Sequence, residues 1–82
     1  MKAKEMFKNV DYELVENTRD RMVYRNRYYQ SAIIEFDKRF EWILNYEVHE
    51  IFHDEEVKLP LAISYPELQA INQQIKELGW TD

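Results

Sequence analysis

One short stretch of the sequence has the residue types of a catalytic metal site. His49, Glu50 and His53 match H-E-x-x-H, in which two histidines bind one zinc ion and the glutamate acts as general base. The pattern requires a helix, because positions four apart there share one face. On a strand the same positions lie about 13 Å apart, at roughly 3.3 Å per residue. A zinc hydrolase is therefore the remote alternative, and we predict no catalytic, metal-binding or cofactor-binding residues.

A second candidate is a strip in which arginines and tyrosines are interleaved. Arg21, Arg25, Arg27 and Tyr28 are its central residues. This combination suits single-stranded nucleic acid, because bases stack on aromatic rings while arginines hold phosphates. The formal net charge of −5 opposes that reading, since phosphate binding is driven by positive charge and counterion release. The structural alternative is that the arginines cover an edge strand, where charge discourages aggregation.

The charges are unevenly distributed along the chain. Residues 1–40 carry nine Lys/Arg and seven Asp/Glu, a net charge of +2, whereas residues 41–82 carry two and nine, a net charge of −7. Between molecules, such complementary regions set the register of a dimer or dock a partner protein. Within one molecule they form weak cross-strand pairs. The acidic stretch consists of Glu41, Glu47, Glu50, Asp54, Glu55 and Glu56.

The composition bounds the class of protein. Eighty-two residues with 45% hydrophobic and 33% charged side chains indicate one globular domain. Without cysteine the chain forms neither disulfides nor thiolate metal sites. The single glycine, Gly79, excludes glycine-rich phosphate-binding loops. No apolar stretch has the length of a signal peptide core or a membrane span, so we expect a soluble, cytoplasmic protein without membrane contact.

The clearest expected element is a helix near the C-terminal end. Ser64 and Glu67 have the spacing of a capping box, and Pro66 fits the first turn, where no intrahelical donor is lost. Gly79 is placed to take the left-handed position after the last turn, from which Trp80 packs back on the helix. The stripe expected to be buried is Leu68, Ile71, Ile75 and Leu78.

A short helix is also expected over residues 3–10, and strands follow it. Three strands are predicted within residues 12–16, 22–25 and 31–36, and in the third Ala32, Ile34 and Phe36 share one face. Residues 53–58 are expected to form a charged connection.

A fourth strand is predicted from residue 40 onward. Alternation favours a strand with its apolar side toward the core, broken only by Ile43. A helix over residues 40–53 fits the same side chains and would bring the two histidines together, so this alternative stays open. The residues expected to face the core are Phe40, Trp42, Leu44, Tyr46 and Val48.

Both ends of the chain carry longer patterns. The opening Lys2-Ala3-Lys4-Glu5-Met6-Phe7, followed by Tyr12, is of the form KAxEMF, and residues 66–80 contain ELQAINxQIxELGW. These patterns resemble those of short uncharacterised proteins encoded by phages and prophages of Gram-positive bacteria. Asp11 stands where that group usually has glycine. The resemblance implies an origin in a mobile element and no particular activity.

We therefore predict a single α+β domain over residues 1–82. A small antiparallel sheet of three to four strands is expected, with an N-terminal and a C-terminal helix packed on one face. The expected function is that of a non-enzymatic accessory protein, acting through protein–protein interaction or self-association as a homodimer. Binding of single-stranded nucleic acid is the alternative. The expected contacts on the outer face of the sheet are Arg21, Arg25, Arg27 and Tyr28.

Overall fold

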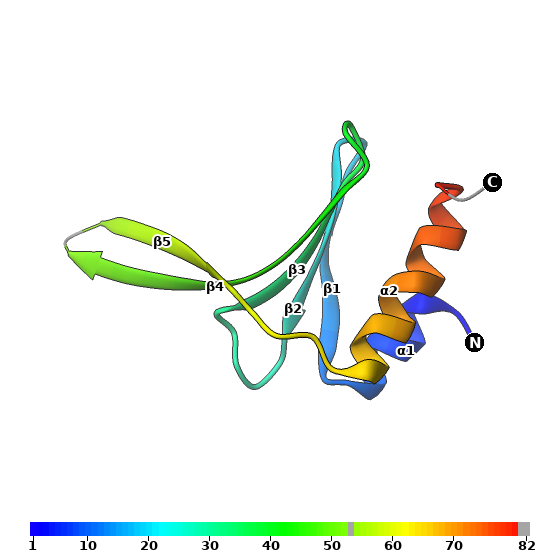
Figure 1. Ribbon diagram of the computed structural model, residues 1–82, viewed down its shortest axis with the longest axis horizontal. Coiled ribbons are helices and arrows are strands. Elements are labelled where there is room, and N and C mark those ends of the chain that lie inside the picture. Colours follow the sequence, from blue (N-terminus) through cyan, green and yellow to red (C-terminus); the bar gives the residue numbers. More distant parts are fainter. Residues whose placement is uncertain (53, 81–82) are drawn as a thin grey trace.

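The computed structural model describes residues 1–52 and 54–80, which form an antiparallel sheet with two helices on one of its faces (Figure 1). The five strands are ordered β1-β2-β3-β4-β5, so each strand pairs with its neighbour in the sequence. The α+β class is confirmed, whereas the expected strand number of three to four is wrong. The elements are α1 (Ala3–Asn9), β1 (Tyr12–Asn17), β2 (Arg21–Asn26), β3 (Ala32–Asp37), β4 (Trp42–Phe52), β5 (Glu55–Pro60) and α2 (Tyr65–Leu78).

The core lies between the helices and the face of the sheet that they cover. Phe7 of α1 stacks on Tyr24 of β2, with 3.9 Å between the ring centroids. The Tyr24 hydroxyl donates a hydrogen bond of 2.6 Å to Oε1 of the buried Gln74, which joins the sheet to α2. Ile34 and Phe36 of β3 are fully buried on the same face, as the alternation in that strand predicts.

The ends of α2 follow local rules. The Ser64 side chain accepts a hydrogen bond from the Glu67 amide and the Glu67 side chain accepts one from the Ser64 amide, which confirms the capping box. Gly79 has φ +76° and ends the helix, and the Trp80 amide donates to the carbonyl of Ile75. One residue of the expected stripe differs, because Leu68 is 42% exposed. Ala70 and Gln74 are buried with Ile71 instead.

The face assignment of β4 is the main departure from expectation. A strand over residues 42–52 is confirmed, and the helix alternative is wrong. In the register with β3, however, Ile43 lies opposite Phe36 and Asn45 opposite Ile34, so Ile43 and Asn45 face the helices. The opposite face therefore receives the residues that were expected in the core, Trp42, Leu44, Tyr46 and Val48, while Phe40 lies in the preceding turn.

The turn between β3 and β4 gives the physical reason. The Asp37 carboxylate accepts hydrogen bonds from the Arg39 and Phe40 amides, at 2.9 and 3.3 Å. Glu41 then has a positive φ of 57°. This geometry sets the pairing register, and a shift of one residue would exchange the two faces of the strand. The periodicity of β4 does not encode that choice.

The second half of β4 and its partner β5 project away from the helices (Figure 1). From Val48 onward β4 pairs within the sheet with β5 alone, because the register with β3 ends at Glu47. The predicted connection over residues 53–58 is wrong for residues 55–58, which belong to β5. We call residues 48–52 and 54–59 the arm. With it, the radius of gyration is 12.9 Å, compared with about 12 Å for a compact domain of this length.

Candidate interaction surface

The outer face of the sheet, which is turned away from the helices, carries two of the four predicted contact residues. Arg21 and Arg25 of β2 line a depression of about 330 Å³ on this face. Arg27 and Tyr28 instead lie in the loop between β2 and β3. The structure therefore divides the predicted strip into two separate places.

Apolar side chains make up much of this outer face. Val23 and Ile33 lie in the depression and are buried, although no helix covers them. Toward β4 the apolar surface is open, because Trp42 is 60% and Leu44 39% exposed. The Trp42 ring lies next to Phe40 of the preceding turn, with 5.0 Å between the centroids. The sheet thus presents hydrophobic surface on the side that sequence analysis expected to be polar.

Charged side chains on the outer face form a linked network. Arg21 forms an ion pair with Glu16 and lies 3.8 Å from the Glu35 carboxylate. The hydrogen bond from Arg21 holds the pKa of Glu16 below its ordinary value. The Tyr46 hydroxyl donates to Glu35 at 2.9 Å, and burial together with this bond raises the pKa of Tyr46 to about 12. The Lys58 ammonium lies 4.7 Å from the centroid of the Tyr46 ring.

The charges around this depression balance. Three cations and three carboxylates line it, together with apolar side chains such as Val23 and Ile33. A surface of this kind is typical of protein interfaces, whereas a nucleic-acid site presents a net positive potential. The charged residues that line the depression are Arg21, Arg25 and Lys58 with Glu16, Glu35 and Glu56.

The loop after β2 forms a separate basic site. The Arg27 guanidinium lies 3.7 Å from the Asp11 carboxylate and 5.3 Å from the centroid of the Tyr28 ring. Arg27 also lines a second depression of about 260 Å³, together with Lys4 and Lys8 of α1. This site lies beside α1 and the beginning of β1, and it shares no lining residue with the depression that holds Arg21 and Arg25.

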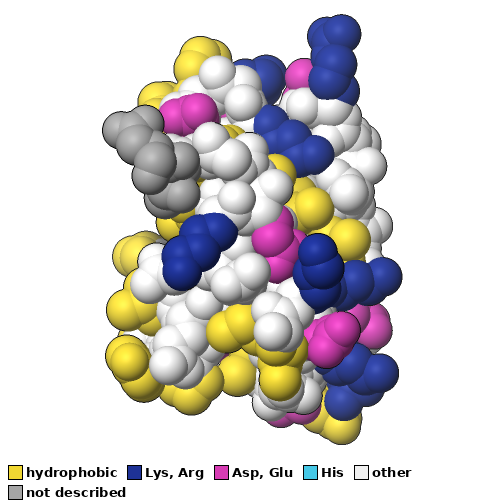
Figure 2. Space-filling view, turned by 90° about the vertical axis from the view of Figure 1, so that its right-hand side faces the viewer, with side chains coloured by type: hydrophobic (Ala, Val, Ile, Leu, Met, Phe, Trp, Pro, Cys, Tyr) yellow, Lys and Arg dark blue, Asp and Glu magenta, His cyan; other side chains and the backbone are white. Residues whose placement is uncertain are grey.

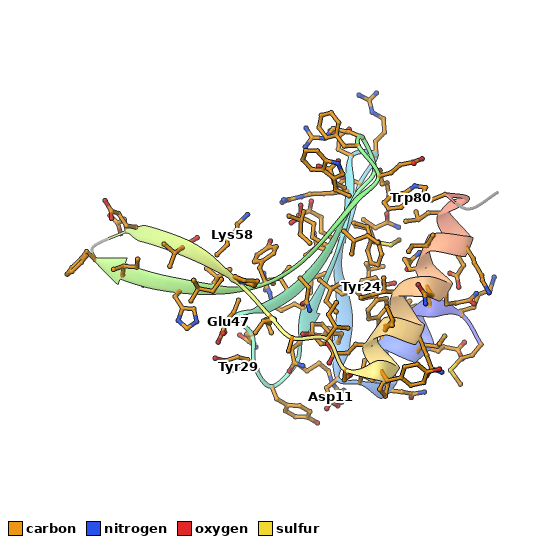
Figure 3. The ribbon with its side chains drawn as sticks, viewed as in Figure 1. Asp11, Tyr24, Tyr29, Glu47, Lys58 and Trp80 are labelled. Atoms are coloured by element: carbon orange, nitrogen blue, oxygen red, sulfur yellow. The ribbon has the colours of Figure 1, made fainter. Side chains whose placement is uncertain are left out.

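The arm also carries exposed apolar side chains. Ile51 and Phe52 are 49% and 70% exposed near the end of β4, and Leu59 of β5 is also exposed. Figure 3 shows that Lys58 and Glu47 project to opposite sides of this hairpin. Sequence analysis missed β5, although the alternation of Glu56, Val57, Lys58 and Leu59 is a short strand signal.

The H-E-x-x-H pattern lies on β4 as far as it is described. His49 faces Val57 across the β4–β5 pair, and its Nε2 lies 3.2 Å from the Glu47 carboxylate. His53 is outside the described residues. Over residues 42–52 the helix that the zinc signature needs does not form. Within residues 1–52 and 54–80, no three histidine, aspartate or glutamate side chains are arranged to hold a metal ion.

The helical side of the molecule differs from the outer face. Figure 2 shows side chains of both charges spread over that side, with hydrophobic side chains along one margin, near the lower end and between the charged groups. Of the helices that the structure describes, neither is long and apolar enough to cross a membrane.

No protein-family model, no curated protein and no solved structure matches this chain.

Proposed function

We propose that the protein acts non-enzymatically, by binding another protein chain through the outer face of its sheet and the arm. The observation that carries this proposal is the position of Trp42 and Leu44, which lie exposed on the side without helices. Exposed apolar patches ringed by polar residues mark interaction sites on soluble domains. The patch continues onto the arm through Val48 on the same side of β4.

The charge pattern supports a protein partner rather than nucleic acid. Arg21 is paired with Glu16 and Glu35, and Arg25 lines a depression in which carboxylates equal the cations in number. A phosphate backbone would meet these carboxylates as well as the arginines, which lowers the counterion-release gain. The nucleic-acid alternative therefore depends on Arg27 and Tyr28 in the loop alone.

The setting in which such a partner occurs follows from the patterns at the two chain ends. The KAxEMF and ELGW-type patterns resemble those of small phage and prophage proteins. We extend the proposal accordingly to an accessory protein of a mobile element, whose partner is encoded by the phage or by its host.

A matched pair of substitutions tests the proposal. Leu44 on the outer face and Leu68 on α2 are 39% and 42% exposed, so a lysine costs the fold a similar, small amount at either place. We expect chemical cross-linking in producing cells to join the wild-type chain and the Leu68→Lys variant to a protein partner. In Leu44→Lys, whose fold is checked by circular dichroism, the product should fall at least about tenfold.

Three results would contradict the proposal. The first is a wild-type chain that forms no cross-linked product with any protein, itself included. The second is loss of the product in Leu68→Lys rather than in Leu44→Lys. The third is tight, salt-sensitive binding of single-stranded DNA or RNA that Arg27→Glu abolishes, which would favour the nucleic-acid alternative instead.

A further inference from the structure

The described chain exposes more surface than a typical monomer of its mass. Its accessible surface is 5931 Å², whereas a monomer of 10.1 kDa exposes about 5,300 Å² on average. The excess is of the same order as the ~800 Å² that each partner buries in a standard protein interface. Exposed hydrophobic side chains of the arm and of the outer face, among them Phe52 and Trp42, contribute to this surface.

The arm carries a pair of like charges. Glu50 of β4 and Glu56 of β5 lie directly opposite each other, which is unfavourable within a strand pair. Both carboxylates line a depression of about 490 Å³, whose other wall includes Arg25 of β2. Among the described residues, no ion pair joins Arg25 to either glutamate. Two complementary charge groups thus border one concave region without contact.

The edges of the sheet are less suited to a partner than this concave region. β1 has a bulge between Leu14 and Glu16, which interrupts its ladder. β5 carries Lys58 and ends in Pro60, and lysine and proline both disfavour strand addition at an edge. A partner that bound by extending the sheet would meet these features. A partner that lies against the outer face uses neither edge, and meets Lys58 only as a charged side chain beside the depression.

We infer that the partner is a second copy of this chain, bound through a two-fold interface in which the arm of each copy lies against the outer face of the other. In such an interface every contact occurs twice. Arg25 of one copy then meets Glu50 and Glu56 of the other, and Val48, on the same side of the arm as Glu50, lies against the apolar surface at Leu44. This inference rests on the proposed function and names its partner.

Charge reversal in two separate chains tests the contact. Arg25→Glu and the double variant Glu50→Lys/Glu56→Lys should each weaken dimer formation by at least about tenfold, because each places like charges in both halves of the interface. An equimolar mixture of the two variants should restore a dimer of near wild-type affinity. In the mixed dimer one half has the original charge pair and the other half has the reversed pair.

Sedimentation velocity at low salt is the measurement, with wild-type chain expected at about twice 10.1 kDa. Lys76→Glu on α2 and Glu5→Lys on α1 serve as matched controls, since both side chains are exposed on the helical side. Neither control should change the dimer, and mixing them should have no effect. Leu44→Lys should abolish dimer formation without any change in the charges of the arm.

The inference is overturned if the wild-type chain stays monomeric at high concentration and low salt, or if mixing the two variants restores nothing. A monomer whose cross-linked partner is still lost in Leu44→Lys would leave the proposed function in place, with a different protein as partner. A triple variant, Arg25→Glu/Glu50→Lys/Glu56→Lys in one chain, distinguishes a contact between two copies from a contact within one copy. If the triple variant forms the dimer again but the mixture of the two separate variants does not, Arg25 contacts the arm of its own chain.

Discussion

The two faces of the sheet have similar side chains in different surroundings. On the helical side, Phe7, Tyr24 and Phe36 are buried and pack ring against ring. On the outer side, Trp42 and Leu44 of the neighbouring strand stay exposed, although they are as apolar. Apolar side chains contribute most to stability where another layer covers them. The comparison therefore separates residues that hold this fold together from residues that are free to bind a partner.

Hydrogen-bonded polar groups also differ between the helical side and the outer side of the sheet. On the helical side the Tyr24 hydroxyl is paired with the buried Gln74, so the bond is closed off from water. On the outer side the Tyr46 hydroxyl is paired with Glu35, which connects to Arg21 at the surface. Both tyrosines have a pKa raised to about 12, in each case chiefly by burial. The outer face is thus partly organised even without a covering layer.

The largest expected effect separates the two faces by stability. Phe36→Ala removes a fully buried ring that contacts Phe7, Tyr24 and Trp80, and should lower the free energy of unfolding by about 3–5 kcal/mol. Trp42→Ala removes a larger but exposed ring and should cost less than about 1 kcal/mol. Urea unfolding followed by circular dichroism measures both.

A loss of 3–5 kcal/mol is a large share of the stability of a domain this size, so Phe36→Ala needs a milder companion. Ile34→Val, on the same buried face, should cost about 0.5–1.5 kcal/mol and keep the fold intact. The experiments are run at several protein concentrations, because binding of a second copy would add to the apparent stability. Equal losses in Phe36→Ala and Trp42→Ala would contradict the distinction between the faces.

An intermediate effect is expected from the buried hydroxyl. Tyr24→Phe leaves the Gln74 carbonyl oxygen buried without its donor and should cost about 1–3 kcal/mol at neutral pH. Tyr65→Phe is the control, since that side chain is exposed at the start of α2 and should change nothing measurable. Urea unfolding at pH 7 measures the two changes.

Tyr24→Phe should also change how the stability depends on pH in the alkaline range. Because the pKa of Tyr24 is raised to about 12 from an ordinary 10.0, the folded state keeps the proton longer than the unfolded chain. The corresponding stability is complete below pH 10 and is lost as the pH rises from 10 toward 12. Tyr24→Phe should flatten this loss, and Tyr46→Phe should do so from the outer face. An unchanged alkaline slope in both variants would show that neither hydroxyl is held in this way.

The smallest effect concerns the contact between the two helices. The Ala3 amide donates a 2.7 Å hydrogen bond to Glu77. Burial acts to raise the pKa of this carboxyl, but the bonds from Ala3 and Gln73 and the charge of Lys2 bring it below its ordinary value. Glu77→Gln should therefore cost less than about 1 kcal/mol at neutral pH, because the Glu77 side chain is exposed to solvent.

The way the stability changes with pH tests the contact between Glu77 and the Ala3 amide. The stability from Glu77 is present above its ordinary pKa of 4.5 and is lost as the pH falls below that value. Glu77→Gln should reduce the acid loss of stability, measured by urea unfolding between pH 3 and 7. Glu5→Gln, at an exposed position of α1, is the control. A variant as acid-sensitive as the wild-type chain would argue against this contact.

Much of the fold is predictable from local patterns. The capping residues Ser64 and Glu67 and the glycine at position 79 define the ends of α2 because each acts within a few residues. The alternation of Ala32, Ile34 and Phe36 identifies a buried face of β3 for the same reason. Of the predicted surface, Arg21 and Arg25 lie on the outer face, while Arg27 and Tyr28 lie in the loop between the second and third predicted strands, where alternation assigns a side chain to neither face.

The rest of the surface was not predictable because it depends on contacts between distant segments. β5 forms a strand through its pairing with β4, although half of its residues are charged. The orientation of β4 depends on the register that the turn at Asp37 and Glu41 imposes. A sequence signal for an apolar outer face was nevertheless present in β3, where Ile33 and Ile34 are adjacent and apolar. Such a pair is typical of a strand buried on both faces.

Helix ends, strand periods and the class of the domain are encoded locally in this chain, because capping and side-chain alternation act over one to four residues. The direction in which Trp42 and Leu44 point depends instead on pairing with β3. A two-residue period specifies that a strand has an apolar side, and only the partner strand specifies which layer that side meets. Among residues 1–52 and 54–80 no second layer covers one face of the sheet, and the candidate interaction surface lies there.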